Sequence, residues 1–251
     1  MWRSHLYAEP PNAPLFYGPF ATDPILYTQP LLEGFDAWLG VGQVLTAPQL
    51  FQGGLTRKVY FPRSSPADRS LYFDLHAPFA THRAGEWATV GTPLEHAGLF
   101  AREGAVVPIG KDMATVTALS GPPRTHTDGV DVVLDTDHGG GGQVGADDWR
   151  GVMIFPGPAT AGSKSKSSSY SGEWIEDDGI SSEPVGTCRV RVSYTSGEEI
   201  GVEVGLDDRG FKPLWAWRLH VVLPAGDKRV VSGATRTVWN GRDAWLLDFS
   251  D

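Results

Sequence analysis

Short runs of alternating apolar and polar residues, separated by turns rich in Gly and Pro, recur through most of this chain. The clearest run is residues 188–194 (CRVRVSY), in which valines and a tyrosine alternate with arginines. A period of two places the apolar side chains on one face of a β-strand. No stretch shows a sustained helical period. Strands that follow one another at roughly 8–12-residue spacing are typical of sandwiches and barrels, so the pattern predicts an all-β fold.

The same period appears in residues 214–224 (LWAWRLHVVLP). One face carries Trp215, Trp217, Leu219, Val221 and Leu223, and the other carries Ala216, Arg218 and His220. Tryptophans on a strand face pack in cores, and they also stack on the C–H faces of sugar rings. Because this face continues into aliphatic residues, we expect core packing, with a sugar-binding platform as the alternative.

Charge and cysteine content exclude several classes of protein. The 251 residues carry a net charge of −9, which argues against nucleic acid or an anionic membrane as a partner. The single cysteine, Cys188, excludes an internal disulfide and a Cys-based zinc cluster, and we interpret it as an inert strand thiol. The first residues lack the apolar core of a secretory signal, and no apolar run approaches the ~20 residues of a membrane span. The sequence therefore predicts a soluble chain and leaves its localisation open.

The glycine-rich stretch and the acids just before it each allow an interpretation that involves a bound group. Residues 140–145 (GGGQVG) satisfy the G-x-G-x-x-G pattern, but dinucleotide binding requires a helix after the glycines, and a strand-like run follows here. The acids and histidine of residues 135–138 (DTDH) fail the calcium-loop pattern and leave only an adventitious cation site as an alternative. We expect a mobile glycine hairpin, and we predict no cofactor and no resident metal.

Residues 172–179 (GEWIEDDG) form the most distinctive short string. Glu176, Asp177 and Asp178 are three consecutive acids that end on Gly179. Such a run is typical of a tight turn in which Asp side chains accept hydrogen bonds from free N–H groups. A general acid/base pair would need one buried and one solvated carboxyl. We interpret the string as a structural turn and assign no catalytic residue.

Four segments occur in a recognisable order. They are residues 13–24 (APLFYGPFATDP), 38–48 (WLGVGQVLTAP) with 58–62 (KVYFP), 92–108 (TPLEHAGLFAREGAVVP) and 172–179 (GEWIEDDG). In this order and spacing they resemble the C-terminal part of glycoside hydrolase family 31, the α-glucosidase and α-xylosidase family. The first is similar to the stretch that closes the family's catalytic barrel. The next two are similar to the start and the end of its proximal β-sandwich, and the last to the G-x-L-Y-E-D-D-G signature of its distal β-sandwich.

The resemblance implies two consecutive antiparallel β-sandwiches, a proximal one at residues 35–113 and a distal one at 114–251, after a short irregular remnant of a (β/α)8 barrel end at 1–34. The family's barrel motif W-x-D-M-N-E has no counterpart in this chain, and Ala13 stands where the family usually has Arg. Retaining glycosidases need two carboxyls about 5–5.5 Å apart. No pair here is assigned that role.

We therefore expect the non-catalytic C-terminal portion of a retaining α-glycosidase that hydrolyses O-glycosyl bonds in carbohydrate metabolism. Its partner would be a catalytic barrel, in cis or in trans, and it would meet carbohydrate only through the whole enzyme. The alternative is a free-standing carbohydrate-binding β-sandwich with exposed indoles at Trp215, Trp217, Trp239 and Trp245. An independent enzyme is a third reading, and it would require two close carboxyls in a cleft. Sugar and linkage specificity would be set by loops of the barrel.

Overall fold

The structure is a computed structural model that describes residues 37–39, 43–49, 52–110, 150–158, 168–177, 186–213, 215 and 218–249. These residues form strands, turns and irregular connections, with no helix among them, and the predicted all-β fold is confirmed. The described part of the chain accordingly holds no helix that is long and apolar enough to cross a membrane. The predicted barrel-end segment, residues 1–34, lies outside the described residues.

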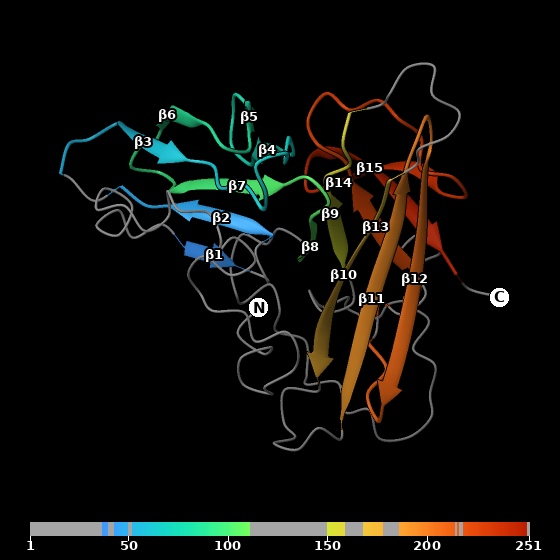
Figure 1. The fold of residues 1–251 in the computed structure, drawn as a ribbon. Helices are drawn as coiled ribbons and strands as arrows, with labels where there is room; N and C mark the ends of the chain where they lie inside the picture. The colour runs from blue at the N-terminus through green and yellow to red at the C-terminus, as the bar shows by residue number, and fades with distance from the viewer. Residues whose placement is uncertain are drawn as a thin grey trace.

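The proximal sandwich consists of strands β1 to β7 (Figure 1). Its larger sheet has the order β1–β2–β7–β4–β5, with bounds Ala37–Leu39, Val44–Ala47, Gly98–Arg102, Leu71–Asp74 and Thr81–Arg83. The smaller sheet pairs β3 (Thr56–Tyr60) with β6 (Trp87–Gly91). The core between the sheets is built around Phe61, whose ring centroid lies 5.2 Å from that of Tyr72 and 5.0 Å from that of Phe100. These aromatic contacts hold the two sheets together.

The distal sandwich consists of strands β8 to β15 (Figure 1). Its larger sheet has the order β14–β15–β13–β9–β8, with bounds Thr235–Trp239, Arg242–Asp248, Arg218–Val222, Gly151–Ile154 and Val106–Ile109. The smaller sheet has the order β10–β11–β12, with bounds Ser168–Asp177, Thr187–Ser196 and Ile200–Arg209. Among the described strands, β9 and β13 form the one parallel ladder, and the other ladders are antiparallel.

The alternation predicted for residues 188–194 is present in β11. Val190, Val192 and Tyr194 are buried, whereas Arg191 is exposed. The buried set packs against apolar residues of β9 and β13 in the opposite sheet. A strand at a sandwich surface has one face in the core and one in water, which is the arrangement that a period of two encodes.

The alternation predicted around β13 holds on one face only. Leu219 and Val221 are buried in the distal core as expected. His220 and Val222 point to the opposite face, yet they are also buried, and the His220 ring stacks on Trp239 at 4.0 Å between centroids. The reason is that β13 is the central strand of its sheet, and a second apolar layer covers its outer face.

That second layer is the seam between the two sandwiches, and we use the word seam for it below. Its buried members are Ala101, Ala105, Met153, Phe155, Val222, Trp239 and Ala244. They come from both sandwiches, and Phe73 of β4 packs on Phe155 at 5.6 Å between ring centroids. The seam is therefore a third hydrophobic core in which the larger sheet of each sandwich contributes side chains.

Strand β8 continues the chain across the seam. It follows β7 closely in sequence, and it pairs with β9 in the larger distal sheet (Figure 1). β8 precedes residue 113, where the sequence places the end of the proximal domain. The predicted boundary itself stays a prediction, because residues 111–149 lie outside the described part of the chain.

Candidate functional site

Of the two acids of the predicted turn that the structure describes, Glu176 is buried and Asp177 is half-buried. Glu176 Oε1 accepts hydrogen bonds from Arg150 Nε at 2.9 Å and from Trp174 Nε1 at 2.8 Å, and its Oε2 accepts one from Arg150 Nη2 at 3.0 Å. Such a bidentate arginine–carboxylate contact is among the strongest hydrogen-bonded arrangements in proteins. It joins the end of β10 to the residue before β9. Glu176 therefore acts as a structural anchor between the two distal sheets.

The rest of the predicted turn is described only in part. Asp177 is half-buried and is the last residue of β10. Asp178 and Gly179 lie outside the described residues, so their role in a turn stays a prediction. The same holds for the glycine-rich stretch 140–145 and the acids at 135–138.

Cys188 is buried in the distal core at the start of β11. Burial, with smaller contributions from the negative charges of Asp208 and Glu176, raises the pKa of its thiol to about 11. The thiolate is the nucleophilic form of cysteine. A thiol that stays protonated at neutral pH and has no solvent access fits the interpretation of an inert strand residue.

The tryptophans named in the carbohydrate-binding alternative differ in exposure. Trp215 and Trp239 are buried, with 1% and 4% of their surface accessible, and Trp245 is half-buried against the distal core. Trp217 lies outside the described residues. Among the tryptophans whose burial the structure describes, Trp87 of β6 is the exposed one, at 37%. The Lys58 ammonium lies 5.0 Å from its ring centroid. No motif in the sequence around Trp87 marks it as a candidate binding residue.

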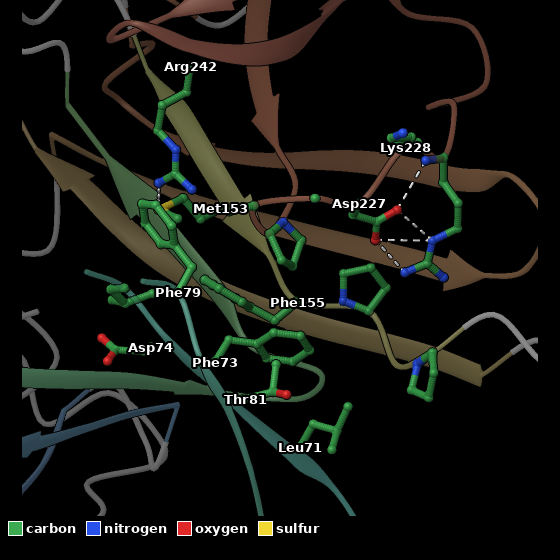
Figure 2. Close-up of a pocket in the computed structure, with 17 residues that line it drawn as sticks. Leu71, Phe73, Asp74, Phe79, Thr81, Met153, Phe155, Asp227, Lys228 and Arg242 are labelled. Atoms are coloured by element: carbon green, nitrogen blue, oxygen red, sulfur yellow. Dashed lines mark hydrogen bonds and ion pairs between the residues drawn. The ribbon is translucent and has the colours of Figure 1, made fainter. Parts of the chain in front are cut away.

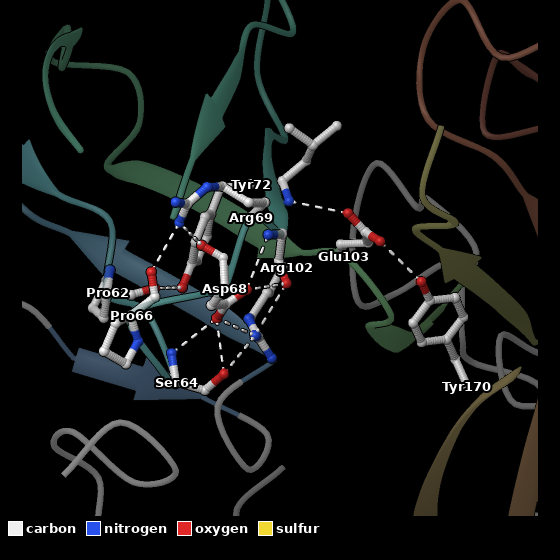
Figure 3. A network of polar contacts seen from close by, with 11 residues as sticks. Pro62, Ser64, Pro66, Asp68, Arg69, Tyr72, Arg102, Glu103 and Tyr170 are labelled. Atoms are coloured by element: carbon white, nitrogen blue, oxygen red, sulfur yellow. Dashed lines mark hydrogen bonds and ion pairs between the residues drawn. The ribbon is translucent and has the colours of Figure 1, made fainter. Parts of the chain in front are cut away.

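A partly buried polar network fixes the loop between β3 and β4 (Figure 3). Asp68 accepts a bond from Arg102 Nη2 at 2.8 Å, and the backbone and hydroxyl groups of Ser64 and Ser70 donate to its two oxygens. Burial on its own would raise the pKa of Asp68, but the hydrogen bonds from Ser70 and Ser64 outweigh it and hold the pKa well below its usual range. The carboxylate stays charged and both of its oxygens accept hydrogen bonds from the protein, so its role is to hold the loop in place.

A polar clasp crosses the seam beside this network (Figure 3). Glu103, just after β7, accepts a hydrogen bond from the Tyr170 hydroxyl at 2.9 Å and from the Leu71 N–H at 3.1 Å. Gly104 lies against the Tyr170 ring, where a Cβ would come within 2.5 Å of Tyr170 Cδ1. Its φ of +89° also favours glycine. The clasp ties the smaller distal sheet to the proximal sandwich.

A cavity of about 340 Å³ lies in the seam, and it is the candidate binding site (Figure 2). β4, β5 and their connection form one wall, and β9, the residues after it and the loop after β13 form the other. Its floor is apolar, with Phe73 and Phe155, and Arg242 and Lys228 stand at its edge. No local sequence pattern indicates this cavity, because its two walls are formed by segments that are between about 70 and 170 residues apart in the chain.

Within the described residues, no group of three or more His, Cys, Asp and Glu side chains is arranged to hold a metal ion. Glu176, Asp68 and Glu103 each accept several hydrogen bonds from the protein itself. The described contacts build two sandwiches that pack against each other, with a small cavity between them.

Solved glycosidase structures match this fold over part of their length. The dextranase FjDex31A of Flavobacterium johnsoniae, a GH31 enzyme complexed with glucose, matches with a TM-score of 0.57 and 18% identity, over 86% of this chain and 25% of the dextranase chain. A mutant of the same dextranase complexed with isomaltotriose gives a TM-score of 0.55 and 17% identity over the same shares of the two chains, 86% and 25%. The GH31 α-xylosidase of Xanthomonas citri gives 0.48 and 19% identity, over 77% of this chain and 16% of that chain. No protein-family model and no curated protein matches the sequence.

The two dextranase matches show that this chain has the fold of an all-β portion of a GH31 enzyme. The resemblance to family 31 that the four sequence segments indicate is thereby confirmed at the level of the fold. The chain spans about a quarter of the dextranase's length, 25%.

Proposed function

We propose that this chain is the non-catalytic C-terminal β-sandwich portion of a retaining α-glycosidase of glycoside hydrolase family 31. It supports a catalytic barrel that belongs to the same enzyme, either in one polypeptide or as a partner. The observation that carries the proposal is the match of both sandwiches to a quarter of a GH31 dextranase. The order of the four family-like segments in the sequence adds independent support.

The state of the carboxylates supports a non-catalytic role. A retaining glycosidase needs one carboxyl that is free to attack the sugar and a second that holds a proton for the leaving group. Glu176 is paired with Arg150, and Asp68 with Arg102. Glu103 is engaged with Tyr170 across the seam. Each of these acids stabilises the chain's own structure, which is what a supporting module requires.

The buried tryptophans weigh against the free-standing carbohydrate-binding alternative. A sugar platform needs an indole face in solvent, and Trp215 and Trp239 have theirs in hydrophobic cores. Titration of the chain with soluble α-glucans should therefore leave the tryptophan emission unchanged. A saturable change in emission, abolished by Trp87→Ala, would favour the carbohydrate-binding alternative.

The proposal is tested by assaying the purified chain alone. We expect no hydrolysis of an aryl α-glucoside or an aryl α-xyloside. A mechanism-based inhibitor that labels the nucleophile of retaining α-glucosidases should add no mass to the chain, while it labels a complete family 31 enzyme in parallel. Turnover that this inhibitor abolishes, with a covalent adduct on a carboxylate of the chain, would show an independent enzyme instead.

A further inference from the structure

Arg242 enters the seam cavity with most of its hydrogen-bonding capacity unused (Figure 2). Its Nη1 lies 3.9 Å from Met153 Sδ, and its guanidinium carbon lies 5.5 Å from the centroid of the Phe79 ring. A thioether is a weak acceptor, and a guanidinium carries five N–H donors. Among the described residues, the ion pairs do not include Arg242. No carboxylate of the described residues therefore accepts from this donor fork, although Arg242 lines the cavity.

The other charged groups around the cavity leave it positive. Lys228 is exposed and has no acid partner within the described residues, whereas its neighbours Asp227 and Arg229 pair with each other. Asp74 is the remaining acid of the lining, and its Oδ1 accepts a hydrogen bond from the His76 N–H. Two free cations thus face one carboxylate that is partly satisfied. This local excess is opposite in sign to the net charge of −9 of the whole chain.

The apolar wall gives the cavity a surface for a ring or a hydrocarbon body. Phe73 and Phe155 pack at 5.6 Å between centroids and line it from the two sandwiches. Phe79 is 41% exposed and has a φ of +58°. A positive φ is unfavourable for a bulky residue, and this one occurs in a turn in which the Phe79 N–H donates to the His76 carbonyl at 2.7 Å. Here it belongs to the residue whose ring lies beneath the Arg242 guanidinium.

We propose that the seam cavity binds a small carboxylate that carries an apolar ring face, the chemistry shared by sugar acids and aromatic acids. Arg242 would hold the carboxylate with two parallel hydrogen bonds, Lys228 would add charge, and the ring would lie on Phe73 and Phe155. The cavity's volume of about 340 Å³ suits a ligand of one or two rings. The proposal requires neither a barrel nor glycosidase chemistry, so it stands or falls separately from the proposed function.

The test is calorimetric titration of the whole chain with two acids and their neutral counterparts. The probes are glucuronate against glucose and phenylacetate against 2-phenylethanol. We expect at least one acid to bind at least about tenfold more tightly than its neutral counterpart, because only the acid can occupy the guanidinium. Binding of glucuronate would indicate a sugar acid as the ligand, and binding of phenylacetate would indicate an aromatic acid. Absence of binding by both acids, or equal binding of a neutral counterpart, would overturn the proposal.

Variants locate the site. Arg242→Gln should weaken binding of the acid at least about tenfold, and Lys228→Gln about threefold. Arg236→Gln is the matched control, because Arg236 pairs with Asp243 and the two side chains are 70% and 79% exposed. It should bind like the parent chain. If Arg242→Gln fails to fold, the test is the affinity of the Lys228→Gln variant for the acid, because Lys228 is exposed and its substitution should not disturb folding. Unchanged affinity in Lys228→Gln would then overturn the proposal.

Discussion

Glu173 and Glu176 stand on the same strand, and both pair with arginine, yet their surroundings differ. Glu176 has 8% of its side chain exposed and binds Arg150 through two hydrogen bonds. Glu173 has 32% exposed, and its contacts with Arg189 and Arg191 are longer, at 3.4 and 3.3 Å. Loss of one partner from a buried pair leaves an uncompensated charge, whereas a surface pair contributes little.

We therefore expect Glu176→Gln to lower the free energy of unfolding by about 3 kcal/mol and Glu173→Gln by about 0.5 kcal/mol. The measurement is urea denaturation followed by circular dichroism at neutral pH. Equal losses in the two variants would contradict the anchoring role assigned to Glu176.

Two histidines of the proximal sandwich make stability depend on pH. Burial, together with the charge of His96 stacked at 3.7 Å, lowers the pKa of His76, and burial lowers that of His82. Nearby Asp74 opposes both shifts. Since the unfolded chain binds protons more readily than the folded one, stability is full above the unfolded pKa of about 6.5 and falls as the pH drops through the lowered folded values.

The unfolding temperature should accordingly fall between pH 7.5 and pH 5, and the fall should be smaller in a His76→Gln/His82→Gln variant. Asp68 acts in a separate window, because its lowered pKa places its loss of stability in more acidic solution. An identical pH profile for parent and variant would exclude the two histidines as the cause.

At the scale of elements, the turn between β7 and β8 fixes how the chain enters the distal sandwich. Gly104 has a φ of +89°, and a Cβ there would meet the Tyr170 ring, whereas Gly233 has a φ of +74° and open space around it. Substitution at Gly233 tests the backbone conformation alone. Substitution at Gly104 adds a clash with a ring that Glu103 holds in place.

Gly104→Ala should therefore cost about 3 kcal/mol of unfolding free energy and Gly233→Ala about 1 kcal/mol. The two costs are compared by urea denaturation under the same conditions. A Gly104→Ala variant that is no less stable than Gly233→Ala would mean that the clasp yields easily and does not fix the turn.

How well each element could be predicted depended on how many of its faces are buried. β11 has one face in the core, and its alternation of valine and arginine predicted both the strand and its buried side. β13 has both faces covered, so the sequence indicated Leu219 and Val221 but not the burial of His220. When distant segments of the chain cover the outer face of a strand, the local alternation of apolar and polar residues does not reveal it.

At the scale of the molecule, packing in the seam determines whether the two sandwiches unfold cooperatively as one unit. Phe155 and Met153 from the distal sandwich pack with Phe73 and Ala101 from the proximal one. Removal of a buried phenylalanine side chain leaves a cavity and costs several kcal/mol. Here that loss falls on contacts that join the two units.

The parent chain should unfold in a single calorimetric transition. Phe155→Ala should lower its stability by about 3–5 kcal/mol and separate the transition into two steps. Phe100→Ala, which empties the proximal core instead, serves as the control and should lower stability without separating the steps. Two well-separated transitions in the parent chain would mean that the seam does not couple the sandwiches.

The sequence predicts the fold class of the whole molecule but not the packing between its two sandwiches. Alternation and turn spacing predicted an all-β fold, and the motif order indicated the family resemblance. The seam cavity was not foreseen, because Phe79 and Arg242 are brought together by packing between units and share no motif. The sequence indicates that Glu176 is an acid in a turn, but its pairing with Arg150 depends on the approach of β9 and β10.

The proposed role of these sandwiches is to support a family 31 catalytic barrel. The direct measurement is native purification of the protein with antibodies against this chain from the cells that produce it, followed by peptide mapping and intact mass. The account predicts barrel peptides with a W-x-D-M-N-E-like segment, in the same polypeptide or in a stoichiometric partner. A chain of 27.1 kDa that is recovered alone and hydrolyses an α-glucoside would contradict it.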